Sequence, residues 1–163
     1  TTRNAYAKYS ETGADYVYNM ERLRRKFETA KTLVPAPLLK KAAEPTRYGV
    51  LYYGSTSPAM DEAFALLAKD GVHVDLMRVR GFPFAAEIED FVAQHDAVYV
   101  VEQNESGQLR MLLINECEID PKRLVRVLHY DGTPITARFI AGKIAENIAA
   151  REEAAPVRQQ VAS

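Results

Sequence analysis

This chain of 163 residues has a single cysteine, Cys117, and no tryptophan. One cysteine permits neither a disulfide within the chain nor an iron–sulfur cluster held by this chain alone. No uninterrupted apolar run approaches the length of a bilayer span, and the first residues contain no apolar signal-peptide region. These absences predict a cytoplasmic chain that has no membrane partner and whose redox centre, if any, is held elsewhere.

An excess of basic charge is also lacking. The chain has 21 Lys and Arg residues against 22 Asp and Glu residues, which gives a net charge of −1 at pH 7. Proteins that bind nucleic acid usually carry a strong basic patch. We therefore expect no nucleic-acid partner. The length itself fits one domain with extensions and allows a substantial core.

Four short apolar runs are each followed by a turn and then by apolar residues at helical spacing. The runs are Tyr48–Tyr53, Val72–Val79, Ala97–Glu102 and Leu124–Leu128. Strands that alternate with helices predict an α/β fold: a three-layer, doubly wound domain with a mostly parallel sheet. The run from Ala97 is almost continuously apolar, as expected of a central strand covered on both faces.

The same pattern divides the chain into three parts. Residues 1–46 contain a polar start, an amphipathic helix and a segment, Leu38–Pro45, that is either a short edge strand or a linker. Residues 47–150 form the α/β domain. Residues 151–163 are rich in Glu, Ala, Arg and Gln, which predicts a disordered tail. Because the chain starts with Thr1 and a polar stretch, we also expect it to come from inside a longer protein.

The first and the last predicted helix each carry an apolar face. In the first, the apolar residues at helical spacing are Val17, Met20, Leu23, Phe27 and Ala30. A charged face lies beside them, which predicts a surface helix. In the last helix Ile140, Ile144 and Ile148 lie four residues apart, and Thr133 with Pro134 is the predicted start.

Ligands of parallel α/β sheets bind beyond the carboxyl ends of the strands. After the first long strand, the turn of Gly54, Ser55, Thr56 and Ser57 can point backbone N–H groups and hydroxyls at a phosphate or carboxylate. Ser57 is also the predicted N-cap of the next helix. A capped turn needs no ligand, so simple capping is the competing interpretation, and the sequence has no Gly-x-Gly-x-x-Gly or P-loop motif.

Six polar residues follow the third and fourth long strands: Glu102, Gln103, Asn104, His129, Tyr130 and Asp131. Parallel neighbouring strands would bring them to one edge. His129 and Asp131 are too few for a metal site, and turn formation is the simpler explanation of Asp131. We expect these residues to form an interface edge toward a neighbouring domain or subunit, with no catalytic residue and no metal site in the chain.

Three other reactive residues are assigned structural roles. Cys117 lies in an apolar helical stripe with Leu109, Leu112 and Leu113, where a buried and inert thiol is expected. His73 and His95 are lone histidines, and such residues are mostly structural or merely exposed.

Three segments taken together resemble a known enzyme family. They are Gly49–Thr56, Val100–Asn104 with Gly107–Leu109, and Leu128–Ala137. In that order they are similar to the 2-oxoacid:ferredoxin oxidoreductases, and most to the C-terminal part of the α subunit of the enzymes that use 2-oxoglutarate. The resemblance extends over most of the chain, from Thr1 to about Asn147.

Such enzymes oxidatively decarboxylate a 2-oxoacid to an acyl-coenzyme A and pass the electrons to ferredoxin, with thiamine diphosphate, magnesium and iron–sulfur clusters. The resemblance implies a transketolase C-terminal-like domain, typically a five-stranded sheet with one antiparallel edge strand, for which Leu38–Pro45 is the candidate. It also implies three partners: the β subunit, the remainder of the α subunit, and ferredoxin by way of the complex.

The chain lacks the family's Gly-Asp-Gly motif and its cysteine clusters. We therefore expect a fragment of the α subunit that serves as a structural and interface domain and is inactive alone. A stand-alone α/β module that binds a small anion or nucleotide is the alternative, and a purely structural domain with an exposed apolar patch is another.

Overall fold

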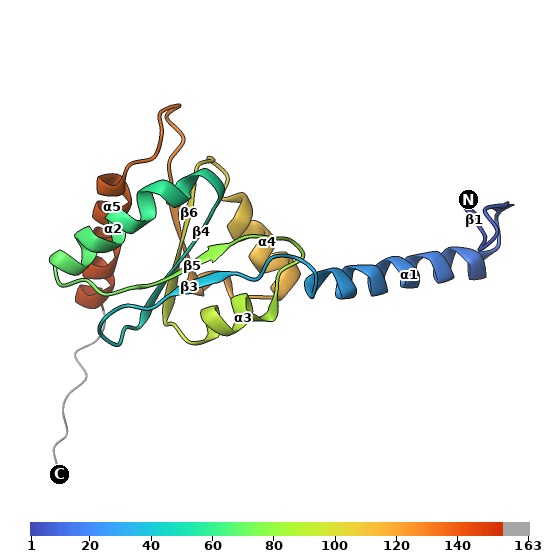
Figure 1. Ribbon diagram of the computed structural model, residues 1–163, viewed down its shortest axis with the longest axis horizontal. Coiled ribbons are helices and arrows are strands. Elements are labelled where there is room, and N and C mark those ends of the chain that lie inside the picture. Colours follow the sequence, from blue (N-terminus) through green and yellow to red (C-terminus); the bar gives the residue numbers. More distant parts are fainter. Residues whose placement is uncertain (155–163) are drawn as a thin grey trace, which may run out of the picture.

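The computed structural model describes residues 1–154, which form an α/β domain and a projecting N-terminal arm (Figure 1). The elements in chain order are β1 (Thr2–Arg3), β2 (Tyr9–Ser10), α1 (Gly13–Lys31), β3 (Leu38–Lys40), β4 (Tyr48–Tyr53), η1 (Gly54–Thr56), α2 (Ser57–Lys69), β5 (Asp75–Val79), α3 (Ala86–Ala93), β6 (Ala97–Glu102), α4 (Gln108–Cys117), η2 (Pro121–Arg123), β7 (Leu124–Leu128) and α5 (Ala137–Ala154). The two η elements are short 3₁₀ helices.

Five strands form one sheet in the order β3-β5-β4-β6-β7. Strands β4, β5, β6 and β7 run parallel, whereas β3 pairs antiparallel with β5 and places Leu39 opposite Met77. The predicted mostly parallel, doubly wound sheet is confirmed. The predicted antiparallel edge strand is also confirmed, and it occupies Leu38–Lys40 of the segment proposed for it.

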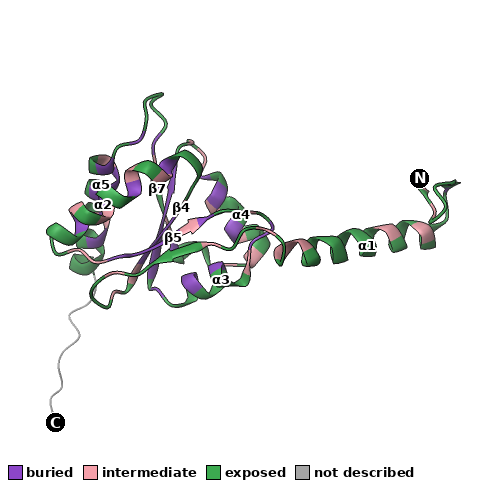
Figure 2. Cartoon of the chain, in the orientation of Figure 1, coloured by how far each residue is buried: buried purple, intermediate pink, exposed green. Residues whose placement is uncertain are grey.

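Helices cover both faces of this sheet and make three layers. Helices α2 and α5 pack on one face over Val50 and Tyr99, and α3 and α4 pack on the other face over Leu51 and Val100. Every residue of β6 is buried, because β6 has strands on both sides and helices on both faces. Figure 2 shows the buried residues gathered in the sheet and on the inward faces of the helices.

The predicted N-cap role of Ser57 is wrong. Ser57 is the first residue of α2, and Thr56 before it already has helical geometry, with φ −69° and ψ −25°. Helix α2 continues directly from η1, so no residue is in the extended geometry that a capping side chain needs. The N-cap position makes no side-chain capping hydrogen bond.

The last helix begins three residues later than predicted, at Ala137. Thr133 instead closes a turn, since its backbone N–H and its hydroxyl both donate to Asp131 Oδ1, at 2.8 and 2.7 Å. The cap is Thr136, whose Oγ1 accepts from the backbone N–H of Phe139 at 3.2 Å.

Two other boundaries differ from the prediction. The second long strand begins at Asp75 rather than Val72. Helix α5 continues through Ala154, so residues 151–154 are helical and the predicted start of the tail at Arg151 is wrong. The remainder of the predicted tail, residues 155–163, lies outside the described residues.

The arm consists of the β1–β2 hairpin and α1, and α1 leaves the domain as a projecting helix (Figure 1). No residue of α1 is buried. The four large side chains of its predicted apolar face are widely exposed, from 39% for Leu23 to 55% for Val17, and Ala30 is half-buried. The helix is therefore at the surface as predicted, but residues 1–154 leave most of its apolar face exposed.

Candidate functional site

The turn after β4 depends on glycine for its backbone shape. Gly54 has φ +57°, in the left-handed region that L residues rarely adopt, and a Cβ there would meet no atom within 4 Å. The conformation rather than close contact therefore explains the glycine. Thr56, at the end of this turn, is 2% exposed.

Gln103 links the turn of residues 54–57 to the predicted interface edge. Its Nε2 donates to Ser55 Oγ at 3.0 Å and lies 3.3 Å from Thr56 Oγ1. The ends of β4 and β6 are thus linked at the carboxyl edge, as parallel neighbours require. The exposed amide of Gln103 fixes the hydroxyls of the turn in place.

Glu102 points into the domain rather than toward a partner. The residue is fully buried, and its carboxylate accepts from the backbone N–H groups of Leu109 (2.7 Å) and Arg110 (3.0 Å). Asn104 Nδ2 donates to it as well, at 3.0 Å. These N–H groups belong to the first turn of α4, where a helix has no internal acceptors. Glu102 is therefore an internal cap of α4 and not the interface residue predicted.

Asn104 shapes the same turn. Its Oδ1 accepts from the backbone N–H groups of Gly107 at 2.7 Å and Gln108 at 3.1 Å. Gly107 has φ +73°, so the turn combines a left-handed glycine with an amide that holds the first N–H groups of α4. Both oxygens of Glu102 and the Oδ1 of Asn104 are thus engaged within the domain.

His129, Tyr130 and Asp131 follow β7 at the same edge. The backbone N–H of His129 donates to Glu102 O at 2.9 Å, and its ring packs edge-on against Phe139 at 4.9 Å between centroids. Its Nε2 lies 3.5 Å from Asp131 Oδ1. The backbone N–H and hydroxyl of Thr133 hold the pKa of Asp131 below its ordinary value. Tyr130 is 64% exposed, so it and Asp131 remain accessible.

A polar cleft of about 680 Å³ opens beside this edge, between α2 and the loop that precedes α5. Ser55, Gln103 and Thr133 supply its hydroxyls and amide, and Glu62 supplies a carboxylate. None of its lining residues, all within the described part of the chain, is basic. An anion in this cleft would meet a negative charge without a positive one, so the predicted anion site gains no support here.

A second cleft, of about 480 Å³, lies on the other side of the Gly54 turn and is mostly apolar. Its lining includes Tyr53, Phe82, Leu109 and Leu112, together with the charged residue Arg80. Leu112 is 42% exposed there, although the sequence pattern placed it in a buried stripe. Only folding brings the end of β4, the loop after β5 and α4 together, so no local pattern predicts this cleft.

The amino edge of the sheet holds a buried charged group that sequence reasoning missed. Asp75 accepts from Lys41 Nζ at 2.7 Å and from the backbone N–H of Ala42 at 2.9 Å, and His95 Nε2 lies 3.2 Å away. Burial acts to raise the pKa of Asp75, but the bonds from Lys41, Ala42 and His95 outweigh it and hold the pKa below the ordinary value. The structural role predicted for His95 is confirmed, since it is 2% exposed and pairs with Asp75.

Cys117 and the possible metal-binding side chains of residues 1–154 show no sign of reactivity or metal binding. Burial, with a contribution from the nearby Glu89, raises the pKa of Cys117 to about 11, so the thiol is protonated at neutral pH and a poor nucleophile. Residues 1–154 contain no group of three or more His, Cys, Asp or Glu side chains placed to hold a metal ion. Within the same residues, no helix combines the length and apolar character needed to cross a bilayer.

Solved structures share this fold. 2-Oxoglutarate:ferredoxin oxidoreductase from Magnetococcus marinus, solved with 2-oxoglutarate, coenzyme A and succinyl-CoA bound, matches with a TM-score of 0.79 at 21% identity. The match covers 90% of this chain and 25% of that one. A split-gene transketolase matches with a TM-score of 0.55 at 19% identity, over 69% of this chain and 41% of that chain. The transketolase C-terminal-like fold is thereby confirmed.

No family model matches the sequence. A curated relative does: subunit alpha of 2-oxoacid:ferredoxin oxidoreductase 2 from Aeropyrum pernix is 31% identical over 103 residues. These residues are 62% of this chain but only 16% of the relative, so the chain spans a small part of that protein's length. The resemblance drawn from the three sequence segments is confirmed: this chain is similar to part of a 2-oxoacid:ferredoxin oxidoreductase α subunit.

Proposed function

We propose that this chain is the transketolase C-terminal-like part of the α subunit of a 2-oxoacid:ferredoxin oxidoreductase, with 2-oxoglutarate as the substrate. The observation that carries the proposal is the 31% identity over 103 residues to an α subunit of that name. The fold shared with the Magnetococcus marinus enzyme, whose structure holds 2-oxoglutarate and coenzyme A, supports the choice of substrate.

In this proposal the complete enzyme converts a 2-oxoacid and coenzyme A to an acyl-coenzyme A and carbon dioxide, and two electrons pass to ferredoxin. Thiamine diphosphate, magnesium and iron–sulfur clusters would supply the carbanion and electron-transfer chemistry. The residues of this chain do not fit these cofactors. Cys117 is its one cysteine, and residues 1–154 contain no cluster of three or more His, Cys, Asp or Glu side chains that could hold a metal ion. We assign these groups to other parts of the enzyme and derive no step through them.

The role that we assign to this part of the chain is structural, in the cytoplasm, within a complex with the β subunit and the rest of the α subunit. Its support is that most polar residues at the carboxyl edge already have partners inside the domain. Glu102 and Asn104 bind the first turn of α4, and Gln103 binds the Gly54 turn. Groups committed to such bonds are poorly placed to act on a substrate.

Gln103, Tyr130 and Asp131 are the predicted interface residues that the domain leaves exposed. Gln103 uses its Nε2 inside the domain, and we propose that its Oε1, with Tyr130 and Asp131, bonds to a neighbouring domain or subunit. Gln103→Ala with Tyr130→Phe should lower the thermal stability of the complete enzyme by more than that of this chain alone, with little change in the KM for the 2-oxoacid. Equal shifts in both, or normal assembly with a raised KM, would contradict an interface role.

Ferredoxin reduction tests the function directly. The complete α subunit is purified with its β subunit and assayed with coenzyme A, ferredoxin and a panel of 2-oxoacids, beside the 163-residue chain alone. We expect the complete enzyme to act fastest on 2-oxoglutarate and the chain alone to be inactive. The proposal fails if the complete enzyme reduces no ferredoxin with any 2-oxoacid, or if the isolated chain turns over.

A further inference from the structure

The exposed face of α1 has the spacing of a helix that packs along another helix. We call this face the seam, and its residues are Tyr16, Met20, Leu23, Phe27 and Ala30. Successive seam residues are separated by four, three, four and three positions, which is the heptad pattern of coiled coils. The four large side chains are between 39% and 54% exposed, so the seam is open along the helix.

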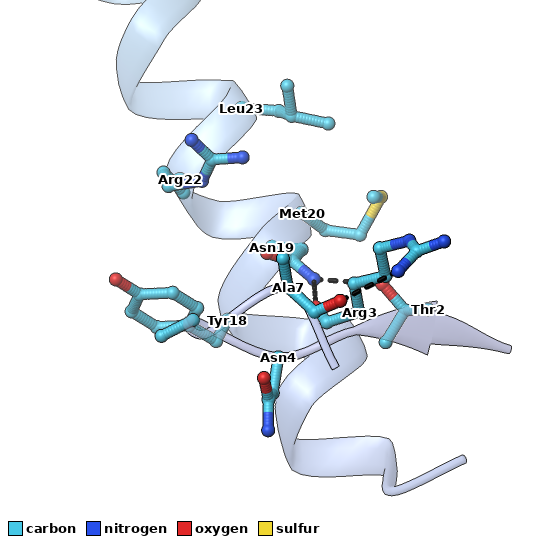
Figure 3. A pocket seen from close by; sticks show the side chains of 10 residues that line it. Thr2, Arg3, Asn4, Ala7, Tyr18, Asn19, Met20, Arg22 and Leu23 are labelled. Atoms are coloured by element: carbon cyan, nitrogen blue, oxygen red, sulfur yellow. Dashed lines mark hydrogen bonds between the residues drawn. The ribbon is translucent and has the colours of Figure 1, made fainter. Parts of the chain in front are cut away.

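The hairpin at the tip of the arm steadies α1 without covering the seam. Asn19 Nδ2 donates to Thr2 Oγ1 at 2.8 Å and to the backbone carbonyl of Arg3 at 2.7 Å (Figure 3). In Figure 3, Met20 and Leu23 project to one side of the helix and Tyr18 projects to the other. Met20 and Leu23 line an open pocket of about 600 Å³ together with Thr2 and Arg3 of the hairpin, and they stay 43% and 39% exposed.

At the base of α1, the seam continues onto the domain. Phe27 shares a cleft of about 280 Å³ with Phe82 and Phe84. The same two phenylalanines line the apolar cleft of about 480 Å³ beside Tyr53 and the Gly54 turn. Glu28, Glu89 and Glu116 also line the first cleft, so the phenylalanine side chains that link the arm to the carboxyl edge of the sheet lie beside carboxylates. A single partner can cover both clefts.

The residues that flank the seam are basic wherever they are charged. In heptad geometry the flanking residues are those that directly follow Tyr16, Leu23 and Ala30 and those that directly precede Met20 and Phe27. They are Val17, Asn19, Arg24, Lys26 and Lys31. Acidic residues lie farther from the seam, at Glu21 and Glu28. They bond to Arg25 at 3.8 Å and to Lys31 at 3.2 Å on the exposed helix surface.

This charge pattern argues against a second copy of the chain as the partner that packs on the seam. In a parallel pair each flank meets the opposite flank of the partner, and in an antiparallel pair it meets the same flank. The charged flank residues are all basic, so a second copy offers them no carboxylate, and a parallel pair brings Lys26 toward Lys31 of the other copy. Like charges at such positions are destabilising. A partner with carboxylates at those positions is favoured instead.

We propose that α1 docks through the seam against a helix of another part of the complete enzyme, one whose apolar stripe is flanked by Asp and Glu side chains. The proposal rests on the proposed function for the existence of that larger assembly. The Magnetococcus marinus match supports the proposal. It covers 90% of this chain, a larger share than residues 36–163 alone, so it includes part of residues 1–35. It covers only 25% of the other chain. The arm thus belongs to a fold found within a much larger polypeptide.

The decisive variant is Phe27→Glu in the complete two-subunit enzyme. A buried, unpaired carboxylate in the seam should lower the thermal midpoint of the complex and abolish the protection of α1 amides against hydrogen exchange. Tyr18→Glu is the matched control, since Tyr18 is 49% exposed on the same helix and projects away from the seam. It should leave both measurements as in the wild type.

A second variant tests the charge of the partner. Lys26→Glu should raise the dissociation constant of the assembly, or that of the docked arm, about threefold to tenfold at low salt. The effect should shrink at high salt, because exposed charge pairs are screened over a Debye length of about 8 Å at physiological ionic strength and less above it. Lys26→Arg keeps the charge and should behave like the wild type.

The outcomes separate the two proposals. A wild-type complex that reduces no ferredoxin defeats the proposed function, while the docking proposal is still decided by the amide protection of α1 and by the Phe27→Glu variant. The docking proposal is overturned if Phe27→Glu matches Tyr18→Glu in midpoint and protection. It is also overturned if the isolated chain forms a dimer that Phe27→Glu dissociates, or if Lys26→Glu strengthens assembly.

Discussion

Helices α1 and α5 are similar in length, at 19 and 18 residues, and each has an apolar face, but their environments differ completely. Ile140, Ile144 and Ile148 of α5 are at most 5% exposed, because α5 packs on α2 and the sheet. The corresponding face of α1 meets no part of the domain along most of its length. An amphipathic pattern therefore identifies a face that needs a partner, but it does not say whether the partner lies in the same chain.

The largest expected difference comes from truncating one side chain in each helix. Ile144→Ala removes a fully buried side chain and should lower the free energy of unfolding by about 2 to 5 kcal/mol. Phe27→Ala, at a side chain that is 54% exposed, should change it by less than about 0.5 kcal/mol in the isolated chain. Urea denaturation measures both. Similar losses for the two variants would show that α1 folds back onto the domain in solution.

Truncating the buried carboxylate of Glu102 should give the next largest loss in the free energy of unfolding. Glu102→Ala leaves the N–H groups of Leu109 and Arg110 without their acceptor inside the domain, at a cost of about 1 to 3 kcal/mol. Glu105→Ala, in the same turn but exposed, is the control and should be close to neutral. If the two variants were equally stable, Glu102 would not be the cap of α4.

The pH dependence of stability should depend on Asp75. Its pKa is held below the ordinary value in the folded chain, so the folded state binds fewer protons than the unfolded state in acid. The resulting stability is fully present above the ordinary pKa of about 3.9 and is lost as the pH falls toward the lower folded pKa. Urea midpoints of the wild type should therefore fall more steeply between about pH 5 and 3 than those of Asp75→Asn. Parallel curves would contradict this assignment.

The sequence predicted the fold because buried parallel strands have almost no polar positions. Ala97–Glu102 and Tyr48–Tyr53 are recognisable on that ground alone. The antiparallel edge strand was different: Leu38–Lys40 is exposed at every residue, so its sequence left a short edge strand and a linker equally open. The family resemblance favoured the strand. Short edge strands carry little signal because their partners, and not their own residues, determine them.

The sequence predicted correctly which strand ends share an edge, but not what each residue does there. Strand ends of a parallel sheet share an edge, and Gln103 does meet Ser55 there. The role of Glu102 was missed, because its acceptor oxygens meet N–H groups seven and eight residues farther along the chain. Whether a carboxylate at a strand end faces solvent or the interior depends on the path of the next loop, which no spacing rule describes.

The smallest effects should appear at the helix starts, where the two helices again differ. Thr136→Ala removes the Oγ1 that accepts from Phe139 at the start of α5, and it should cost about 1 kcal/mol. Thr12→Ala, at the N-cap position of α1, should be nearly neutral, because Thr12 makes no side-chain capping bond. Ser57→Ala should also be nearly neutral, since Ser57 lies inside α2. Chemical denaturation of the three variants ranks them, and a loss for Thr12→Ala as large as that for Thr136→Ala would mean that the arm helix is capped and coupled to the domain after all.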